Sequence, residues 1–345
     1  MKKRRLVSFV LLILLLFTSC TYGTNQTEST NAESALQTAQ FHFIDVGQGD
    51  CALIRSGDTN IMIDAGTRES GSIICEYLSN LGIDYLDCFI GTHPHEDHMG
   101  GGAAVLLGVD VGNVYLNGET TTSYFFERFV DVLIDKEITP YIPDLGIEYD
   151  IGPFKLEFLS PQKDFGNSND NSLVLTVKYG DVTALYTGDA ERSVEAELIK
   201  NGENINADIL KVSHHGSRYA SSVEFLNKVS PSVAVISSGS GNSYGHPHKE
   251  ALERIEKCGA EILRCDREGT VVLSTDGKEV YNASGEAFEK REESEQRQVY
   301  IGNRKSKVFH CETCPNLPGN KNRVIFNKRE NAVMAGYSVC GNCNP

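Results

Sequence analysis

The chain has 345 residues, of which 40% are hydrophobic and 23% are charged, and its formal net charge is −15. This composition excludes a globally disordered chain, and the lack of an apolar run of roughly 18 residues excludes a multi-pass membrane protein. The acidity also argues against a nucleic-acid coat protein, which depends on bulk positive charge. The charge is uneven, because residues 1–19 carry +4 and residues 299–345 carry +5, so that residues 20–298 carry −24.

Residues 1–19 are organised like a secretion signal. Four basic residues (Lys2–Arg5) precede an apolar run (Leu6–Phe17) that is too short to span a membrane as a mature helix. Two small residues then adjoin Cys20, and this arrangement resembles the lipobox of bacterial lipoproteins, which implies lipid on Cys20. We therefore expect an extracytoplasmic protein anchored to the bacterial cell membrane, with residues 20–40 as a flexible polar tether. An ordinary cleaved secretion signal is the alternative.

Residues 41–285 alternate short β runs with amphipathic helical patterns. The predicted strands are Phe41–Val46, Cys51–Arg55, Asn60–Asp64, Leu86–Gly91, Asn113–Leu116, Lys155–Leu159, Ser172–Tyr179, Val182–Tyr186, Ile209–Val212, Val233–Ser237 and Gly269–Ser274. The predicted helices are Ser72–Leu81, Phe125–Lys136, Ser193–Lys200, Ser222–Val229 and Lys249–Lys257. Many strands in two halves, with helices interspersed, predict an α/β fold in which sheets pack together and helices cover them.

A histidine-rich loop follows the predicted strand Leu86–Gly91. Its residues His93, His95, Asp97 and His98 lie within six positions, so that they can converge on metal from one loop. The side chains of His93 and His95, two residues apart, can point in one direction, while those of Asp97 and His98 can reach a second metal position. Nitrogen and oxygen ligands without thiolate suit zinc, manganese or iron. A solvated loop is the alternative, but the proline and paired glycines of this segment favour a constrained backbone.

This HxHxDH pattern resembles the metallo-β-lactamase superfamily, and the segment TGDA (187–190) resembles that superfamily's bridging-aspartate turn. Four further segments resemble its branch of ComEC competence proteins, namely FIDVGQGD (43–50), IDAG (63–66), SHHGS (213–217) and SYGHP (243–247). The resemblance implies an αββα four-layer sandwich with its active site along one edge, where strands end.

The resemblance also implies a metal site. The expected ligands of one or two zinc or manganese ions are His93, His95, Asp97, His98, Asp189 and His246. The first two would hold one ion, the next two a second ion, and Asp189 would bridge them. Asp64 would orient a ligand histidine. No organic cofactor is expected, because the ions would activate the attacking water.

Two further histidines, His214 and His215, follow the predicted strand Ile209–Val212. One could be a ligand and the other could protonate a leaving oxygen, so that they join Asp97 as catalytic candidates. A histidine satisfied by backbone hydrogen bonds is the alternative for either one. At Asn171 the branch departs from the superfamily, which usually has a histidine there. That difference leaves manganese or a single ion open as alternatives to two zinc ions.

A charged linker (286–298) leads to a C-terminal segment (299–345) with clustered cysteines. A segment this small cannot build a sufficient core, so a structural zinc is expected. Two knuckles offer a tetrahedral set of ligands, His310, Cys314, Cys340 and Cys343. An all-cysteine site with Cys311 in place of His310 is one alternative, and disulfides are another.

The spacing in this segment resembles the metal-binding domain of the Ada repair proteins. His310 stands where that family has a nucleophilic cysteine that accepts a methyl group. The resemblance therefore implies an Ada-like zinc-binding fold but not the repair chemistry. The segment's charge of +5 suits contact with phosphate backbones. A solvated basic surface that binds the bacterial envelope is the alternative.

Together these features predict a membrane-tethered, metal-dependent hydrolase that cleaves phosphodiesters, with DNA as the expected substrate. A small-ester, lactone or β-lactam hydrolase of the same fold is one alternative. A non-catalytic DNA-binding lipoprotein is another. The sequence leaves the substrate, the native metal and the oligomeric state open.

Overall fold

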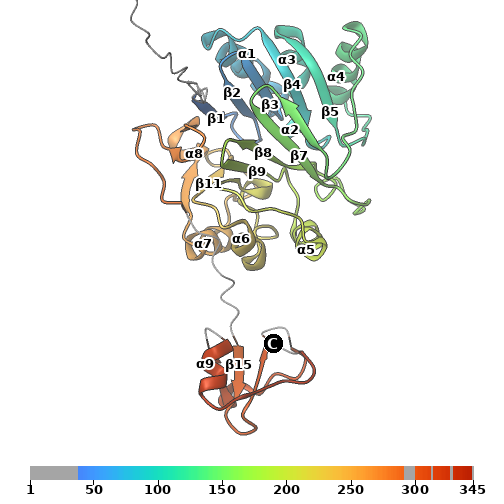
Figure 1. Cartoon of the computed structure of the whole chain (residues 1–345). Coiled ribbons are helices and arrows are strands. Elements are labelled where there is room, and N and C mark those ends of the chain that lie inside the picture. The colour runs from blue at the N-terminus through green and yellow to red at the C-terminus, as the bar shows by residue number, and fades with distance from the viewer. Residues whose placement is uncertain (1–37, 291–299, 312–313, 327–328, 344–345) are drawn as a thin grey trace, which may run out of the picture. The chain divides into compact units, whose positions relative to one another are not determined.

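The computed structural model describes residues 38–290, 300–311, 314–326 and 329–343. The predicted signal, its lipidation site Cys20, most of the tether and most of the charged linker lie outside these residues. The described residues form a large α/β domain and a small C-terminal module (Figure 1). None of the helices in these ranges has the length and apolar composition that crossing a membrane requires.

Two seven-stranded sheets form the centre of the large domain. The first has the order β14-β13-β1-β2-β3-β4-β5 and the second β12-β11-β10-β9-β8-β7-β6. The first-sheet strands are β1 Ala39–Phe43, β2 Ala52–Ser56, β3 Thr59–Ile63, β4 Tyr85–Gly91, β5 Asp110–Leu116, β13 Val271–Thr275 and β14 Val280–Tyr281. The second-sheet strands are β6 Glu148–Ile151, β7 Phe154–Ser160, β8 Val174–Tyr179, β9 Val182–Tyr186, β10 Ile209–Lys211, β11 Val233–Ile236 and β12 Glu261–Arg264. Each sheet has a parallel part, β3-β4-β5 in the first and β9-β10-β11-β12 in the second.

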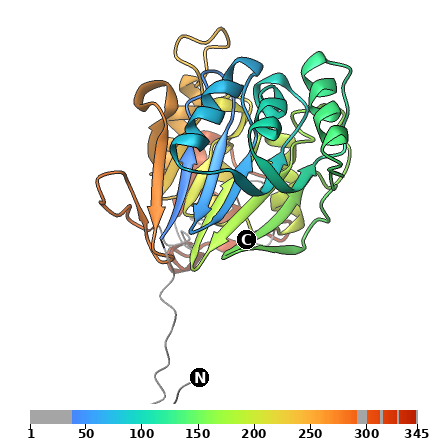
Figure 2. The same cartoon turned by 90° about the horizontal axis from the view of Figure 1, so that it is seen from above.

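Helices cover the outer face of each sheet. On the first sheet these are α1 Gly71–Asn80, α3 Gly102–Gly108 and α4 Tyr124–Asp135; on the second they are α5 Arg192–Asn201, α6 Val223–Val229 and α7 Lys249–Cys258. Figure 1 shows the two helical layers on opposite sides of the strands, and in Figure 2 the blue and teal helices lie together over one face. The order of layers is therefore helix, sheet, sheet, helix, which confirms the predicted αββα sandwich.

Three apolar cores separate the four layers, one between the sheets and one under each helical layer. Successive side chains of a strand point to opposite faces of the sheet, so a single strand contributes residues to two cores. In β1, Phe41 and Phe43 face the second sheet. His42, between them, points to the helical side, where its Nδ1 lies 2.7 Å from the hydroxyl of Tyr77 in α1. Full burial of each phenylalanine contributes roughly 1.5–3 kcal/mol.

The large domain extends on both sides of the predicted range of residues 41–285. Strand β1 begins at Ala39, because Ala39 pairs with Thr275 of β13 at the start of the sheet. At the other end, the backbone N–H of Phe288 donates to the carbonyl oxygen of Val280, and the phenylalanine ring is buried in the core between the sheets. The first residues of the predicted charged linker therefore pack on the domain.

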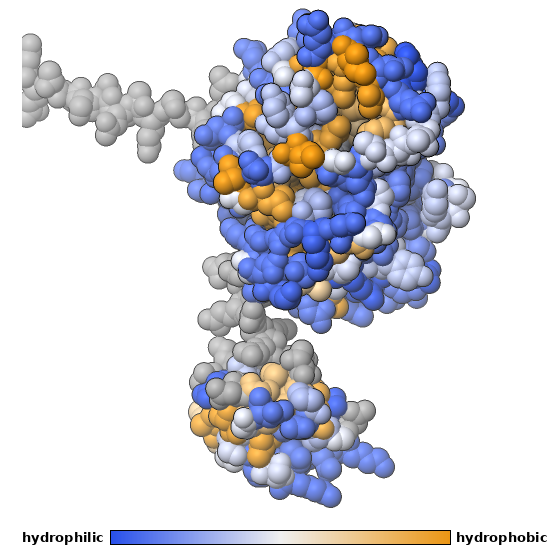
Figure 3. Space-filling view, turned by 90° about the vertical axis from the view of Figure 1, so that its right-hand side faces the viewer, coloured by the Kyte–Doolittle hydropathy of each residue, from blue (hydrophilic) through white to orange (hydrophobic). Residues whose placement is uncertain are grey.

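The C-terminal module is built on a four-stranded sheet of order β17-β15-β16-β18. Its elements are β15 Tyr300–Asn303, β16 Val308–Cys311, η3 Asn320–Asn322, β17 Arg323–Phe326, α9 Arg329–Met334 and β18 Ser338–Val339. Its core holds few buried residues, chiefly Tyr300, Phe309, Ala332 and Tyr337. In Figure 3 apolar residues (orange) and hydrophilic residues (blue) are mixed on its surface. A core this small needs a further source of stability.

The buried imidazole of His42 should make the large domain less stable in acid. Burial, with a smaller effect from Arg55, lowers the pKa of His42 from 6.5 to about 4. The unfolded chain therefore binds a proton below pH 6.5, whereas the folded domain does so only near pH 4. The stability that this residue contributes is fully present above pH 6.5 and is lost as the pH falls toward 4. Between pH 8 and pH 5 we expect a loss of about 2 kcal/mol in the free energy of unfolding.

The matched variant is His42→Gln, which stays neutral throughout this range. Urea unfolding at pH 8 and pH 5, with chelator present so that metal binding does not contribute, measures the difference for both proteins. An equal acid-induced loss in the variant and the wild type would contradict the assignment to His42.

Candidate metal centre

Four strand ends deliver the predicted site residues to one edge of the large domain. Thr92 follows β4, Asp64 follows β3, Asp189 follows β9 and His214 follows β10. These strands belong to the parallel parts of the two sheets or adjoin them, so their carboxyl ends reach the same edge. The chain turns away from the sheet there, which leaves polar side chains free to converge.

The predicted ligands converge in two adjoining groups. One group consists of His93, His95 and Asp189, and the other of Asp97, His98, Asp189 and His215. Within each group the candidate ligand atoms all lie within 4.8 Å of one another. Asp189 belongs to both groups, in the bridging place that the sequence predicts.

His246 lies beside these groups, and the structure does not bring it into either of them. Its ring centroid is 6.1 Å from that of His215 and 5.4 Å from that of His214. Burial, followed by the charges of these two histidines, lowers its pKa to about 4. The sequence predicts His246 as the last histidine ligand and leaves one of His214 and His215 open as a ligand; in the structure His215, and not His246, belongs to a metal group.

His214 and His215 have different surroundings because of an unusual backbone. Their φ angles are 49° and 52°, in the left-handed region that non-glycine residues rarely adopt. This conformation directs the ring of His215 into the second metal group and leaves the ring of His214 outside both groups. Nδ1 of His214 lies 2.9 Å from Oε1 of Glu191, and its Nε2 lies 3.6 Å from Oδ2 of Asp189.

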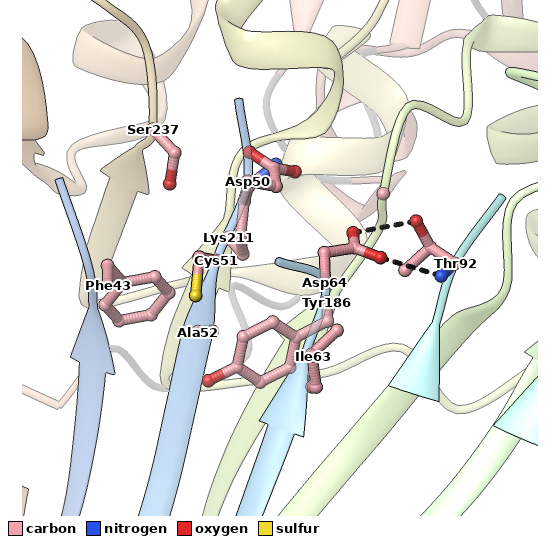
Figure 4. A pocket seen from close by; sticks show the side chains of 11 residues that line it. Phe43, Asp50, Cys51, Ala52, Ile63, Asp64, Thr92, Tyr186, Lys211 and Ser237 are labelled. Carbon is pink, nitrogen blue, oxygen red and sulfur yellow. Dashed lines mark hydrogen bonds and ion pairs between the residues drawn. The ribbon is translucent and has the colours of Figure 1, made fainter. Parts of the chain in front are cut away.

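Asp64 fixes the orientation of the His98 ring through its Nδ1 atom. Its Oδ2 lies 2.8 Å from Nδ1 of His98, and the backbone N–H and hydroxyl of Thr92 donate to its two oxygens at 2.8 Å each (Figure 4). This is the kind of contact with a candidate ligand histidine that the sequence predicts for Asp64. It directs Nε2 of His98 toward Asp189, whose Oδ1 is 3.2 Å away.

A second carboxylate, Asp50, supports His215 in a similar way and was assigned no role from the sequence. Its Oδ1 lies 3.2 Å from Nδ1 of His215, which also lies 2.9 Å from the carbonyl oxygen of Ser237. Asp50 forms a buried ion pair with Lys211 of β10 (Figure 4 shows both residues). The sequence did contain a signal for this pair, because Lys211 interrupts an apolar β run and Asp50 is the last residue of the FIDVGQGD segment.

Ser172, and not Asn171, faces the first metal group. The amide nitrogen of Asn171 donates to Glu119 at 2.7 Å and to Asp164 at 3.0 Å, away from the candidate ligands. The hydroxyl of Ser172 lies 3.2 Å from Nδ1 of His93 and accepts a hydrogen bond from the backbone N–H of Asp189 at 3.1 Å. The position of the missing histidine therefore contributes no ligand, and Ser172 orients His93.

The electrostatics of the second group favour bound positive charge. Burial alone would lower the pKa of His215, but the carboxylates of Asp189 and Asp50 outweigh it and raise this pKa to about 10. The pKa of His98 also lies well above its ordinary value, because Asp189 and Asp64 outweigh burial. Burial would raise the pKa of Asp189, but His98 and His215 lower it well below its ordinary value. The carboxylates thus hold positive charge here, as protons or as cations.

The donors also fit a divalent cation by their chemistry. Nε2 of His93 is buried and has no hydrogen-bond partner among the described residues, while its Nδ1 is held by Ser172 and Thr92. Imidazole nitrogens and carboxylate oxygens are ligands of zinc and manganese. The two groups would therefore hold cations through residues that the chain has already oriented.

A cavity of about 240 Å³ gives access to the two groups. Its walls combine candidate ligands with polar and aromatic side chains, namely Gln48, His95, Asp97, Asn169, Asp189, His214, His215, Tyr244 and His246. His95 also lines a neighbouring polar cavity together with Glu119 and Ser168. A small molecule from solvent can therefore reach four of the candidate metal ligands, His95, Asp97, Asp189 and His215.

Residues 44–240 match the family model of the Metallo-beta-lactamase superfamily. The chain belongs to this superfamily. The predicted fold, site edge and family thus agree, and the chain is a metal-dependent hydrolase of the metallo-β-lactamase fold. Residues 284–345 match the model of the metal binding domain of Ada, which confirms the predicted likeness of the C-terminal module.

The relatives of this metallo-β-lactamase-fold chain include competence proteins, as the sequence motifs predict. ComE operon protein 3 of Bacillus subtilis is 29% identical over 247 residues, which cover 66% of this chain and 32% of that protein. Competence protein ComA of Neisseria gonorrhoeae is 32% identical over 230 residues, covering 66% and 31%. The chain therefore spans about a third of the length of these relatives. Among solved structures, the metallo-beta-lactamase fold protein YhfI of Bacillus subtilis is 15% identical, with a TM-score of 0.49 over 69% of this chain and all of that one.

The C-terminal module contains a separate set of metal-binding donors. His310, Cys314, Cys340 and Cys343 could hold one ion, and they are the four ligands that the sequence predicts. Nδ1 of His310 lies 3.3 Å from Sγ of Cys314, which lies 4.0 Å from Sγ of Cys340. Cys311 is not in this group; its backbone N–H donates to Sγ of Cys343 at 3.4 Å. Three thiolates and one imidazole suit a tetrahedral structural zinc.

Loss of one thiolate should unfold the C-terminal module. We expect Cys340→Ser to weaken zinc binding by about 100-fold or more, since even residues that only orient a ligand contribute about 10- to 100-fold. Because the core is small, the module should then become sensitive to protease. Zinc content by mass spectrometry and limited proteolysis measure both effects.

Cys75→Ser is the matched control, because the thiol of Cys75 donates to the carbonyl oxygen of Ala104 in the large domain and belongs to neither metal site. Full zinc content and protease resistance in Cys340→Ser would contradict the assigned ligand set.

Proposed function

We propose that this protein is an extracytoplasmic, membrane-tethered phosphodiesterase that cleaves DNA. The observation that carries the proposal is the pair of adjoining donor groups that share buried Asp189 at an open cavity. Two cations held side by side supply Lewis-acid polarisation and neutralise the charge of a phosphodiester. A charged substrate of this kind is compatible with an otherwise acidic domain only where cations are held.

The chain's own residues can supply the proton that the leaving oxygen needs. His214 stands at the cavity wall outside both metal groups, and Glu191 accepts a hydrogen bond from its Nδ1. This bond leaves Nε2 on the other side of the ring, where Asp189 lies 3.6 Å away. A proton carried on Nε2 can therefore be given to a leaving oxygen in the cavity, while Glu191 stabilises the ring.

The relatives and the C-terminal module support DNA as the substrate. One relative is named a competence protein and another a recombination protein, and recombination is a reaction of DNA. In the C-terminal module, the basic side chains of Arg304, Lys305, Lys307 and Lys321 are exposed and suit phosphate contacts. Membrane tethering is supported by the lipobox-like sequence before Cys20.

The test is cleavage by the full chain, supplied with zinc or manganese, of single- and double-stranded DNA. An Asp97→Ala, His98→Ala double variant is the control, because it removes two donors of the second group. A β-lactam, a lactone and an aryl ester complete the panel. Absence of DNA cleavage by the wild type, or equal cleavage by the double variant, would refute the proposal. Preferential hydrolysis of the β-lactam, lactone or ester would establish the alternative that the superfamily name suggests.

A further inference from the structure

The segment between β11 and α7 places an exposed tyrosine at the mouth of the metal-site cavity. Tyr244 is 63% exposed, yet it lines the same cavity as Asp97, Asp189 and His215. An aromatic ring offers a large, rigid apolar face at little cost in conformational entropy. At this place such a face is available to a ligand whose other part reaches the metal groups.

The ring of Tyr244 continues a row of rings that begins in the second metal group. The ring centroid of His246 lies 6.1 Å from that of His215, and their planes differ by 31°. The ring centroid of Tyr244 lies 5.7 Å from that of His246, and the planes of these two rings differ by 21°. One face of the tyrosine therefore rests on His246, and its exposure keeps the ring accessible from solvent.

Asn242 holds the loop in this shape. Its side-chain nitrogen donates to the carbonyl oxygens of Gly239 at 2.8 Å and His246 at 2.6 Å. Its side-chain oxygen accepts from the backbone N–H groups of Tyr244 at 3.1 Å and His246 at 3.0 Å. These bonds fix the backbone on both sides of Tyr244, so a ligand need not order the loop when it binds.

We infer that Tyr244 is a substrate-positioning residue whose ring stacks on a nucleobase close to the scissile phosphate. This inference rests on the proposed function and narrows its substrate to a nucleic-acid strand with an unpaired base near the cut. A base within a duplex is already stacked on its neighbours and must leave the stack to reach the tyrosine. Stacking on an aromatic ring corresponds to about 5- to 150-fold in affinity per base.

The experiment compares two oligonucleotides of equal length and phosphate charge, a single-stranded DNA and the same strand with abasic tetrahydrofuran units. The full chain, supplied with zinc or manganese, is assayed for cleavage and, by fluorescence anisotropy, for binding. We expect Tyr244→Ala to weaken binding and raise KM about 5- to 150-fold on the strand with bases, with kcat changed by less than about threefold. The abasic strand should be unaffected, and Tyr244→Phe should behave as wild type.

Tyr219→Ala is the matched control, because Tyr219 is 60% exposed but is not among the residues lining this cavity. An unchanged KM and affinity of Tyr244→Ala for the strand with bases would overturn the inference. So would an equal loss on both strands, because the tyrosine would then only support His246. If wild type cleaves no DNA, the proposed function fails separately, and loss of base-dependent binding in Tyr244→Ala still decides the stacking role.

Discussion

Replacing Asp189 by alanine should reduce kcat/KM by about 1000-fold or more and strip the large domain of its bound metal. Asp189 is the donor common to the two metal groups, so its loss weakens both at once, and even residues that only orient metal ligands contribute about 10- to 100-fold. It is also the nearest carboxylate to Nε2 of His98, at 3.2 Å. Metal content by mass spectrometry, together with kcat/KM on the best substrate of the panel, measures the effect.

Asp181→Ala is the matched control, because Asp181 precedes the strand β9 that Asp189 follows, and its side chain is exposed. This variant should keep full metal content and activity. If Asp189→Ala retained the full metal content of wild type, or retained activity within about tenfold of wild type, the shared-ligand geometry would be wrong.

The sequence predicts those elements well in which an apolar pattern continues over a whole strand or helix. The strand Val182–Tyr186 has the same bounds in the sequence analysis and in the structure. The two edge strands of the second sheet, Glu148–Ile151 and Glu261–Arg264, were not predicted, because exposed charged residues interrupt their apolar pattern. The helix Gly102–Gly108 was missed because glycines begin and end it and favour turns.

The site was predictable where one loop supplies several donors, as the segment from His93 to His98 does. It was not predictable where backbone conformation decides. Adjacent histidines in a strand would point to opposite faces, but the left-handed backbone of His214 and His215 separates them into a pocket residue and a member of the metal group. No sequence pattern predicts that conformation, so the structure was needed to tell which of His214 and His215 belongs to the metal group.

The buried pair of Lys211 and Asp50 leads to the second large effect. Lys211→Met should lower the free energy of unfolding by about 3–5 kcal/mol, because it removes the nearer of the cationic partners of the buried Asp50 carboxylate and leaves only the histidines of the metal site beside it. Both side chains are nearly inaccessible to water, at 4% and 6% exposure, so solvent cannot replace the lost partner. Urea unfolding of the chelated protein measures the change without a contribution from bound metal.

A double variant separates the ion pair from simple packing. In Lys211→Met with Asp50→Asn, both charges are gone, and we expect the double variant to regain about 1–3 kcal/mol relative to Lys211→Met alone. A single variant within about 1 kcal/mol of wild type would show that the carboxylate of Asp50 needs no lysine. Because Asp50 also contacts His215, the double variant should bind the second cation more weakly than wild type even where stability is regained. The free energy of unfolding therefore reports on the contact between Asp50 and Lys211, and metal affinity reports on the contact between Asp50 and His215.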